Sequence, residues 1–162
     1  MSTTVVVGNP KLGSRTRHAA ELVVERLTGS PPDAVIEVAE LGPALLGWGD
    51  PAVDAAKQVV RDADLVVFAS PTFKATYTGL LKLFLDQFAA GELQGTTAVA
   101  LMLGAGPQHA LAGEYTLKPV LSEIGCSCPT PALYLLESTW EDSPELDAWL
   151  DRARDVPFRS GA

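Results

Sequence analysis

The chain has 162 residues, of which 47% are hydrophobic, and a formal net charge of −8 at pH 7. A chain of this length can bury roughly 70% of its unfolded surface, so we expect one domain over residues 1–162. The negative charge excludes nucleic-acid binding, which needs a basic surface, and no apolar stretch approaches the ~20 residues that span a membrane.

Five apolar runs bounded by turn residues predict strands at residues 3–8, 34–39, 64–69, 96–103 and 131–136. Stretches with an apolar period near 3.6 predict helices at residues 14–28, 51–62, 77–89, 108–124 and 143–155. Several of the strands are apolar throughout, which is typical of parallel strands covered on both faces. The alternation predicts an α/β fold, a three-layer flavodoxin-like sandwich with a five-stranded parallel sheet of order 2-1-3-4-5.

This strand order brings three loops to the carboxyl edge of the sheet. They follow the first, third and fourth strands, at residues 8–14, 70–77 and 104–109. Open α/β sheets bind their ligands at such an edge, where the strand order reverses. We therefore expect the three loops to form a site for a phosphorylated, planar cofactor.

The first loop is locally basic in an acidic chain. Residues 1–20 contain Lys11, Arg15 and Arg17 but no acidic side chain. Ser14 or Thr16 can cap the following helix, whose free N–H groups and dipole favour a phosphate. The alternative is a solvated helical turn that happens to be basic. The loop matches neither the P-loop nor the Gly-x-Gly-x-x-Gly pattern, which excludes those two kinds of nucleotide site.

The other two loops are suited to a flat ring. Glycines in the segment 104–109 allow the backbone to approach a ring closely. His109 could act as an acid or a ligand, or could only cap a helix. No metal-ligand set and no Ser/His/Asp arrangement is evident, so we predict neither a metal site nor a catalytic side chain.

The two cysteines, Cys126 and Cys128, are too close in sequence for an ordinary disulfide. They are either small buried residues or a redox or metal pair. Because the first twenty residues also lack the apolar core of a secretion signal, we expect a cytoplasmic protein.

Three further features point to contacts or irregular structure. The helix at 77–89 has an apolar stripe, and Leu83 lies outside it, which indicates a homodimer or homotetramer. Pro119 cannot donate to the carbonyl of Tyr115, so the helix at 108–124 should bend or widen there, with Tyr115 either near the ring or simply packed. The apolar loop at 42–50 either covers something, meets a partner or packs on the surface.

Residues 8–16, 70–82 and 109–119 resemble the NADPH-dependent FMN reductases of the flavodoxin-like superfamily, above all the flavin reductases of two-component alkanesulfonate monooxygenases. The resemblance implies FMN and NADPH or NADH as cofactors. It also implies that reduced flavin is supplied to a partner monooxygenase. Hydride transfer then belongs to the cofactors, and the protein supplies orientation and charge stabilisation.

The resemblance also implies the site residues. The FMN phosphate would be held by Ser14, Arg15 and Thr16, in a loop with Asn9 and Lys11 where Ser and Arg are more usual. The ring would be bordered by Pro71, Thr72, Phe73 and Lys74, faced by Gly104, Ala105 and Gly106, and approached by Tyr115, an insertion at the subunit interface.

Other functions remain open at this stage. An FMN-dependent quinone or azo reductase would use the same flavin with another acceptor. A flavodoxin-like electron carrier would bind FMN without oxidising a nicotinamide, and an interaction module could keep the scaffold without flavin. The sequence also leaves open whether FMN is a prosthetic group or a substrate.

Overall fold

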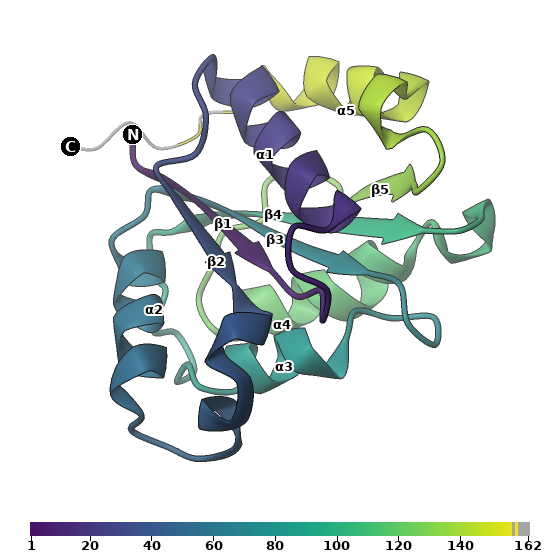
Figure 1. Ribbon diagram of the computed structural model, residues 1–162. Helices are drawn as coiled ribbons and strands as arrows, with labels where there is room; N and C mark the ends of the chain where they lie inside the picture. The colour runs from purple at the N-terminus through teal and green to yellow at the C-terminus, as the bar shows by residue number, and fades with distance from the viewer. Residues whose placement is uncertain (157, 159–162) are drawn as a thin grey trace.

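A five-stranded parallel sheet forms the middle layer of the computed structural model, which describes residues 1–156 and 158 (Figure 1). The strand order is β2-β1-β3-β4-β5, as predicted. The strands are β1 (Thr3–Val7), β2 (Ala34–Glu37), β3 (Leu65–Pro71), β4 (Thr97–Gly104) and β5 (Leu133–Leu136).

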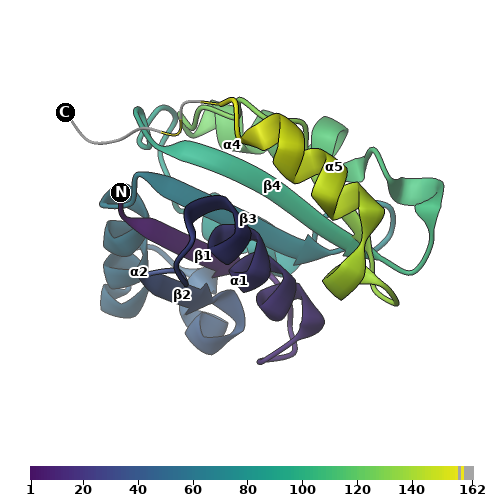
Figure 2. The same cartoon turned by 90° about the horizontal axis from the view of Figure 1, so that it is seen from above.

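Helices cover both faces of the sheet. They are α1 (Arg15–Thr28), α2 (Pro51–Arg61), α3 (Gly79–Leu85), α4 (Lys118–Glu123) and α5 (Pro144–Ala153). Helices α1 and α5 lie on one face, and α2, α3 and α4 lie on the other (Figures 1 and 2). Within residues 1–156 and 158, no helix combines the length and apolar character needed to cross a bilayer.

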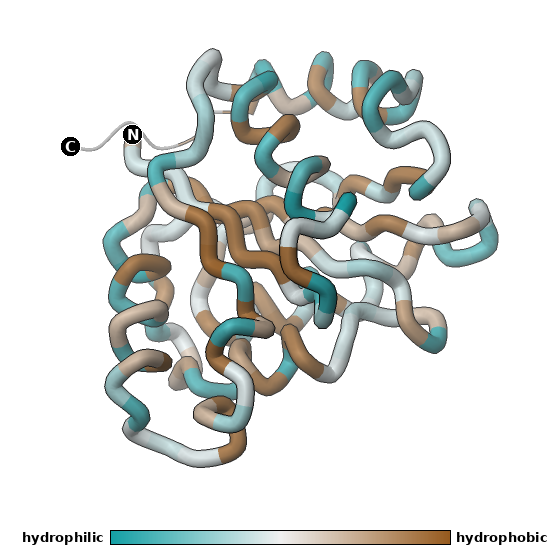
Figure 3. The backbone as a smooth tube through the Cα atoms, viewed as in Figure 1, coloured by the Kyte–Doolittle hydropathy of each residue, from teal (hydrophilic) through white to brown (hydrophobic). Residues whose placement is uncertain are grey.

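The core follows from the apolar strands, which run through the centre of the molecule (Figure 3). Every residue of β1, β3 and β4 is buried. Phe68 packs toward α3, whereas Val67, its neighbour in the strand, packs in the cluster that contains Trp149 of α5. Burying each large apolar side chain stabilises the fold by about 1.5–3 kcal/mol. Two apolar layers therefore fix the sheet between its helices.

The register of the strands aligns their carboxyl ends. Val7 of β1 lies opposite Ala69 of β3, which in turn lies opposite Leu101 of β4. The loops that leave these three strands consequently begin at the same edge.

The predicted helix at 108–124 is divided into three pieces. A 3₁₀ turn, η2 (Pro107–His109), is followed by a π-helical segment, η3 (Gly113–Leu117), and then by α4. The N–H of Lys118 donates to the carbonyl of Gly113, five residues earlier. Because Pro119 has no N–H to give to Tyr115, the helix widens as the sequence predicts.

Helix α3 is shorter than the predicted 77–89. Thr78 caps it by accepting a hydrogen bond from Leu81 N–H at 3.1 Å. Leu81, Phe84 and Leu85 are buried, whereas 37% of Leu83 is exposed. The apolar stripe thus faces the sheet, and Leu83 faces outward.

Candidate functional site

Hydrogen bonds join the three predicted loops at one edge of the sheet. Gly8 N–H donates to the Ala69 carbonyl at 2.8 Å, and the Thr78 hydroxyl donates to the Gly8 carbonyl at 2.6 Å. Thr72 N–H donates to the Leu103 carbonyl at 2.7 Å. The loop after β3 is therefore bonded to the ends of both β1 and β4.

Gly8 allows the close approach of α3. A Cβ atom at this position would lie 2.5 Å from the Cβ of Leu81. Any larger residue would push α3 away from the end of β1 and would break the bond from Thr78.

A cavity of about 290 Å³ opens at the start of α1. Its walls include all five predicted residues of the first loop: Asn9, Lys11, Ser14, Arg15 and Thr16. They also include Gly13 and three residues that the sequence did not single out, namely His18, Leu103 and Glu137. His18 lies one helical turn beyond Ser14, and this spacing could have suggested it.

Two buried hydroxyls face this cavity from the helix start. Ser14 caps α1 and accepts a hydrogen bond from Arg17 N–H at 3.3 Å. The Thr16 hydroxyl accepts one from the Asn9 side-chain amide at 3.0 Å. Since a hydroxyl can accept and donate at once, both retain a hydrogen for an anionic ligand.

Asn9 braces the loop at both of its ends. Its side-chain oxygen accepts a hydrogen bond from Lys11 N–H at 2.9 Å, and its amide nitrogen reaches Thr16. In the structure, the Asn9 side chain therefore fixes the shape of the loop through these two hydrogen bonds.

Glu37, the last residue of β2, contacts the first loop, which the sequence did not reveal. Its side chain is 4% exposed, and its Oε1 accepts hydrogen bonds from Gly13 N–H at 2.8 Å and from Arg17 at 3.3 Å. Hydrogen bonding to Glu21 and, more weakly, to Glu37 raises the pKa of Arg17. The Gly13 N–H is thus engaged by Glu37 and is not available to a ligand.

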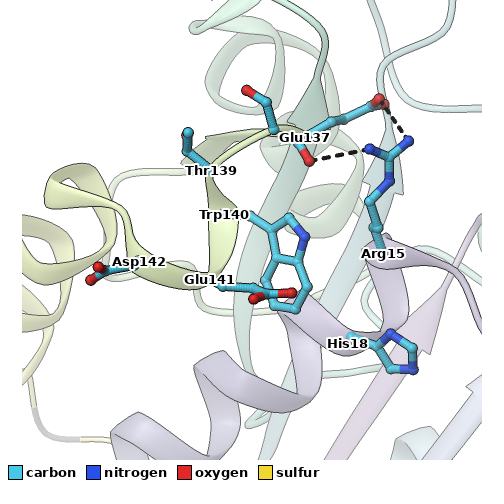
Figure 4. Close-up of a pocket in the computed structure, with 8 residues that line it drawn as sticks. Arg15, His18, Glu137, Thr139, Trp140, Glu141 and Asp142 are labelled. Carbon is cyan, nitrogen blue, oxygen red and sulfur yellow. Dashed lines mark hydrogen bonds and ion pairs between the residues drawn. The ribbon is translucent and has the colours of Figure 1, made fainter.

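Arg15 connects α1 to the segment after β5 (Figure 4). Its guanidinium donates to the Glu137 carbonyl at 3.2 Å and lies 3.4 Å from the Glu137 carboxylate. The Arg15 side chain is 62% exposed. An exposed ion pair contributes about 0–1 kcal/mol, so this guanidinium can be shared with a ligand at small cost.

The loop after β3 contains a two-residue turn. Phe73 and Thr76 exchange backbone hydrogen bonds of 2.9 and 3.2 Å around Lys74 (φ 51°) and Ala75 (φ 67°). Both central residues have positive φ, which resembles the type I′ geometry that favours Asn and Gly. The turn presents Phe73, which is 50% exposed, at the edge of the sheet. Pro71 and Thr72 lie at the base of this loop and do not line the cavity at α1.

The loop after β4 depends on Tyr134 of β5. A Cβ atom on Gly104 would overlap the Tyr134 hydroxyl, which donates to the Gly106 carbonyl at 2.7 Å. Burial raises the pKa of Tyr134. Glycine at 104 is therefore required by Tyr134, whereas the sequence suggested only the approach of a ring.

Residues 1–141 match the model of the NADPH-dependent FMN reductase family. The chain belongs to this family. As an NAD(P)H-dependent FMN reductase, it is an oxidoreductase with FMN and NAD(P)H as its cofactors.

Individual relatives of this FMN reductase agree with the family match. The FMN reductase (NADPH) of Escherichia coli K12 is 31% identical over 128 residues, which cover 76% of this chain and 67% of the relative. The NADH-dependent FMN reductase SfnF of Pseudomonas putida is 30% identical over 126 residues, covering 73% and 68%. The apo structure of the NADH:FMN oxidoreductase EmoB superposes with a TM-score of 0.84 at 31% identity, covering 95% of this chain and 86% of that one.

The donor set at α1 fits the phosphate of FMN. Buried hydroxyls on Ser14 and Thr16, cationic groups on Lys11 and Arg15, and a helix N-terminus line one cavity. Each of these groups favours an anion. The predicted ring residues lie at or just after the ends of β3 and β4. None of them is among the residues that line this cavity, which β4 reaches through Leu103.

Tyr115 of this FMN reductase lies on η3 and is 72% exposed. The residue before it fixes the segment: the Glu114 carboxylate accepts hydrogen bonds from Ala132 N–H and from Lys118, both at 2.7 Å. Partial burial raises the pKa of Glu114, but these two hydrogen bonds outweigh burial and lower it on balance. Tyr115 does not line the cavity at α1.

The two cysteines are free thiols in the interior. Cys126 is buried and Cys128 is half-buried. Burial raises the pKa of Cys126 to about 12 and also raises the pKa of Cys128. Neutral thiols are poor nucleophiles and poor ligands, which favours the interpretation as small buried residues.

Proposed function

We propose that FMN binds across the three joined loops, with its phosphate in the cavity at α1 and its ring along the ends of β3 and β4, and that the reduced flavin passes to a partner monooxygenase. The observation that carries the proposal is the cavity itself. It combines two buried hydroxyls, two cationic side chains and the N-terminus of α1.

The phosphate would be held by Ser14, Arg15 and Thr16, with Lys11 adding charge at the exposed side. Each charge-assisted hydrogen bond contributes about 1.5–3 kcal/mol, and the helix dipole about 0.3–1 kcal/mol. Asn9 and Glu37 would act indirectly. Asn9 orients Thr16, and Glu37 holds Gly13.

The ring would lie against the second and third loops, bordered by Pro71, Thr72, Phe73, Lys74, Gly104, Ala105 and Gly106. When bound, FMN supplies the hydride-accepting chemistry, with NAD(P)H as the donor. The protein orients the ring and provides backbone N–H groups, and the Lys74 ammonium stabilises negative charge that develops on the ring. This arrangement needs no catalytic acid or base from the chain.

Release of reduced flavin to another enzyme is supported by the openness of the site. Arg15 is 62% exposed, and Phe73, at the opposite loop, is 50% exposed. A ligand held between such residues can leave without unfolding of the loops. The likeness of residues 70–82 and 109–119 to the reductases of two-component monooxygenases points to the same partner.

The assignment of the phosphate is tested by Arg15→Ala. We expect the apparent FMN dissociation constant to rise about tenfold or more, since one charged contact is worth over about 1.4 kcal/mol. Flavin fluorescence titration measures this directly. Arg26→Ala, at the far end of α1, is the matched control. An unchanged FMN affinity in Arg15→Ala would contradict the assignment.

The acceptor is tested by steady-state oxidation of NADH and of NADPH with FMN, a quinone or an azo compound as the only acceptor. We expect rapid turnover with free FMN. We also expect the reduced flavin to be transferred to a flavin-dependent monooxygenase. Turnover with quinone but not with free FMN would favour a quinone reductase. Bound FMN without oxidation of either NADH or NADPH would favour an electron carrier.

We also propose a homodimer or homotetramer formed through α3 and α4. A groove of about 390 Å³ lies between these helices. Its lining includes the apolar side chains of Leu85, Phe88 and Val120 and the charged side chains of Lys82, Asp86 and Glu123. Leu83 lies on α3, and Tyr115 lies on η3, the segment that leads into α4. Both side chains are exposed. Light scattering should show an oligomer that Leu83→Glu dissociates, and a monomeric wild type would overturn this proposal.

A further inference from the structure

A second cavity, of about 450 Å³, opens beside the one at α1 (Figure 4). The segment after β5 lines it with residues 137–142, which include the 3₁₀ turn η4 (Trp140–Asp142). Arg15 and His18 line it from α1. Pockets for small molecules have volumes of about 300–1,000 Å³, so this one can hold a molecular fragment.

The two cavities share part of their walls. Arg15, His18 and Glu137 line both of them. A group attached to the outer side of a phosphate at α1 would pass Arg15 and enter the second cavity. The position therefore suits the remainder of a dinucleotide.

The side chains of the second cavity suit a nucleoside. Trp140 is half-buried and packs against the core that contains α5, which fixes its indole as a platform for a base. The exposed carboxylates of Glu141 and Asp142 can accept hydrogen bonds from ribose hydroxyls or from an exocyclic amine. Bases stack on aromatic side chains of this kind.

The charges of the cavity limit what else it can take. Glu137, Glu141 and Asp142 are acidic, and the Arg15 guanidinium is already paired with Glu137. An additional phosphate on the ribose would lie among carboxylates and would be repelled. The lining thus favours an unphosphorylated ribose.

We propose that the cavity at residues 137–142 is a subsite for an unphosphorylated adenosine group of a dinucleotide. The proposal rests on the assignment of the flavin phosphate to the neighbouring cavity. Two molecules carry such a group: FAD, whose adenosine follows the flavin phosphate through a pyrophosphate, and NADH, whose pyrophosphate would have to take the place of the FMN phosphate at α1. NADPH, with its 2′-phosphate, fits poorly.

The test uses Trp140→Leu, which keeps an apolar side chain in the core but removes the stacking surface. Trp140→Phe, which restores an aromatic ring, is the rescue variant, and Trp48→Leu, an exposed tryptophan on another loop, is the matched control. Thermal unfolding verifies that each variant is folded. Dissociation constants are measured for FMN and FAD, and KM values for NADH and for reduced nicotinamide mononucleotide, which lacks adenosine.

If FAD occupies the subsite, Trp140→Leu weakens FAD binding about fivefold or more and leaves FMN binding within about twofold. If NADH occupies it, the KM for NADH rises to a similar extent, and the KM for reduced nicotinamide mononucleotide does not. Either result supports the adenosine subsite and shows which of the two dinucleotides binds there. Equal losses for FMN and FAD, or no loss for FAD and NADH, would overturn it. Failure of the phosphate assignment is seen separately, as unchanged FMN affinity in Arg15→Ala.

Discussion

The carboxylate of Glu37 accepts a hydrogen bond from the backbone N–H of Gly13 at 2.8 Å, across 24 residues of sequence. This bond ties the loop at the start of α1 to the end of β2. Removing the acceptor leaves a polar group without its partner, which costs about 1–3 kcal/mol. We expect Glu37→Ala to lower the free energy of unfolding by that amount in urea denaturation. Glu37→Gln, which keeps an acceptor for Gly13, should cost less, and equal losses would mean that the charge toward Arg17 matters more.

Glu137 holds Arg15 and places a carboxylate at the edge of the proposed phosphate site. Glu137→Gln removes that charge and frees the guanidinium for a ligand. Since an exposed ion pair is worth up to about 1 kcal/mol, FMN should bind about two- to fivefold more tightly. Flavin titration at low and high salt measures the effect, which should shrink as salt rises. Weaker binding in Glu137→Gln, with Glu123→Gln unchanged, would count against the role given to Arg15.

The fixing of η3 by Glu114 should depend on pH. The pKa of Glu114 in the folded chain lies below its ordinary value of 4.5, so its contribution to stability is present above that value and is lost as the pH falls through the lower, folded pKa. We expect Glu114→Gln to lower the stability near neutral pH and to flatten the loss of stability between about pH 5 and pH 3. Thermal unfolding across this range tests it. Glu123→Gln, at the end of α4, should keep the wild-type slope.

Ala75 adopts a positive φ of 67° in the turn after β3. An L-residue pays about 1–2 kcal/mol for this conformation, while glycine loses about 0.5–1 kcal/mol in backbone entropy. Ala75→Gly should therefore stabilise the fold by up to about 1 kcal/mol, seen as a higher melting temperature. Ala55→Gly within α2 should have the opposite effect. A destabilised Ala75→Gly would show that the turn is held by other contacts.

Gly104 and Tyr134 should behave as a coupled pair. Gly104→Ala forces the Tyr134 ring to move, and overpacking of this kind costs about 1–3 kcal/mol. Tyr134→Leu removes the hydroxyl and part of the ring, so the double variant should lose less stability than the two single losses added together. A double-mutant cycle in urea measures the coupling. Additive losses would mean that Gly104 is needed for another reason.

Local patterns explain which parts of the molecule could be predicted. Continuous apolar runs specified the strands. The sequence predicts that Ser14 or Thr16 caps α1, and the cap is Ser14. It also predicts that Pro119 bends or widens its helix, and η3 is widened. Each of these signals depends on a few neighbouring residues and can therefore be recognised in the sequence alone. The predicted strand order then brought the three loops together.

The decisive contacts of the site could not be predicted in this way. Arg15 donates a hydrogen bond to Glu137, which is 122 residues away in the sequence. Glu37 accepts a hydrogen bond from Gly13, and no sequence motif in that loop indicates this bond. Tyr134 requires Gly104 only because β5 pairs with β4 in one register. Such contacts depend on packing in three dimensions, and the sequence offers only the residue types.

The bonds from Thr72 to Leu103 and from Thr78 to Gly8 anchor the segment between them at each end. Between these anchors, residues 73–77 are the part of the loop that can shift, and the proposed ring would lie against them. Any wider opening would also release the hydroxyl that caps α3, because the same Thr78 oxygen makes both bonds. In the proposed complex, adjustment on this side of the site would thus be restricted to one short turn, and flavin would be exchanged past Arg15 on the opposite side.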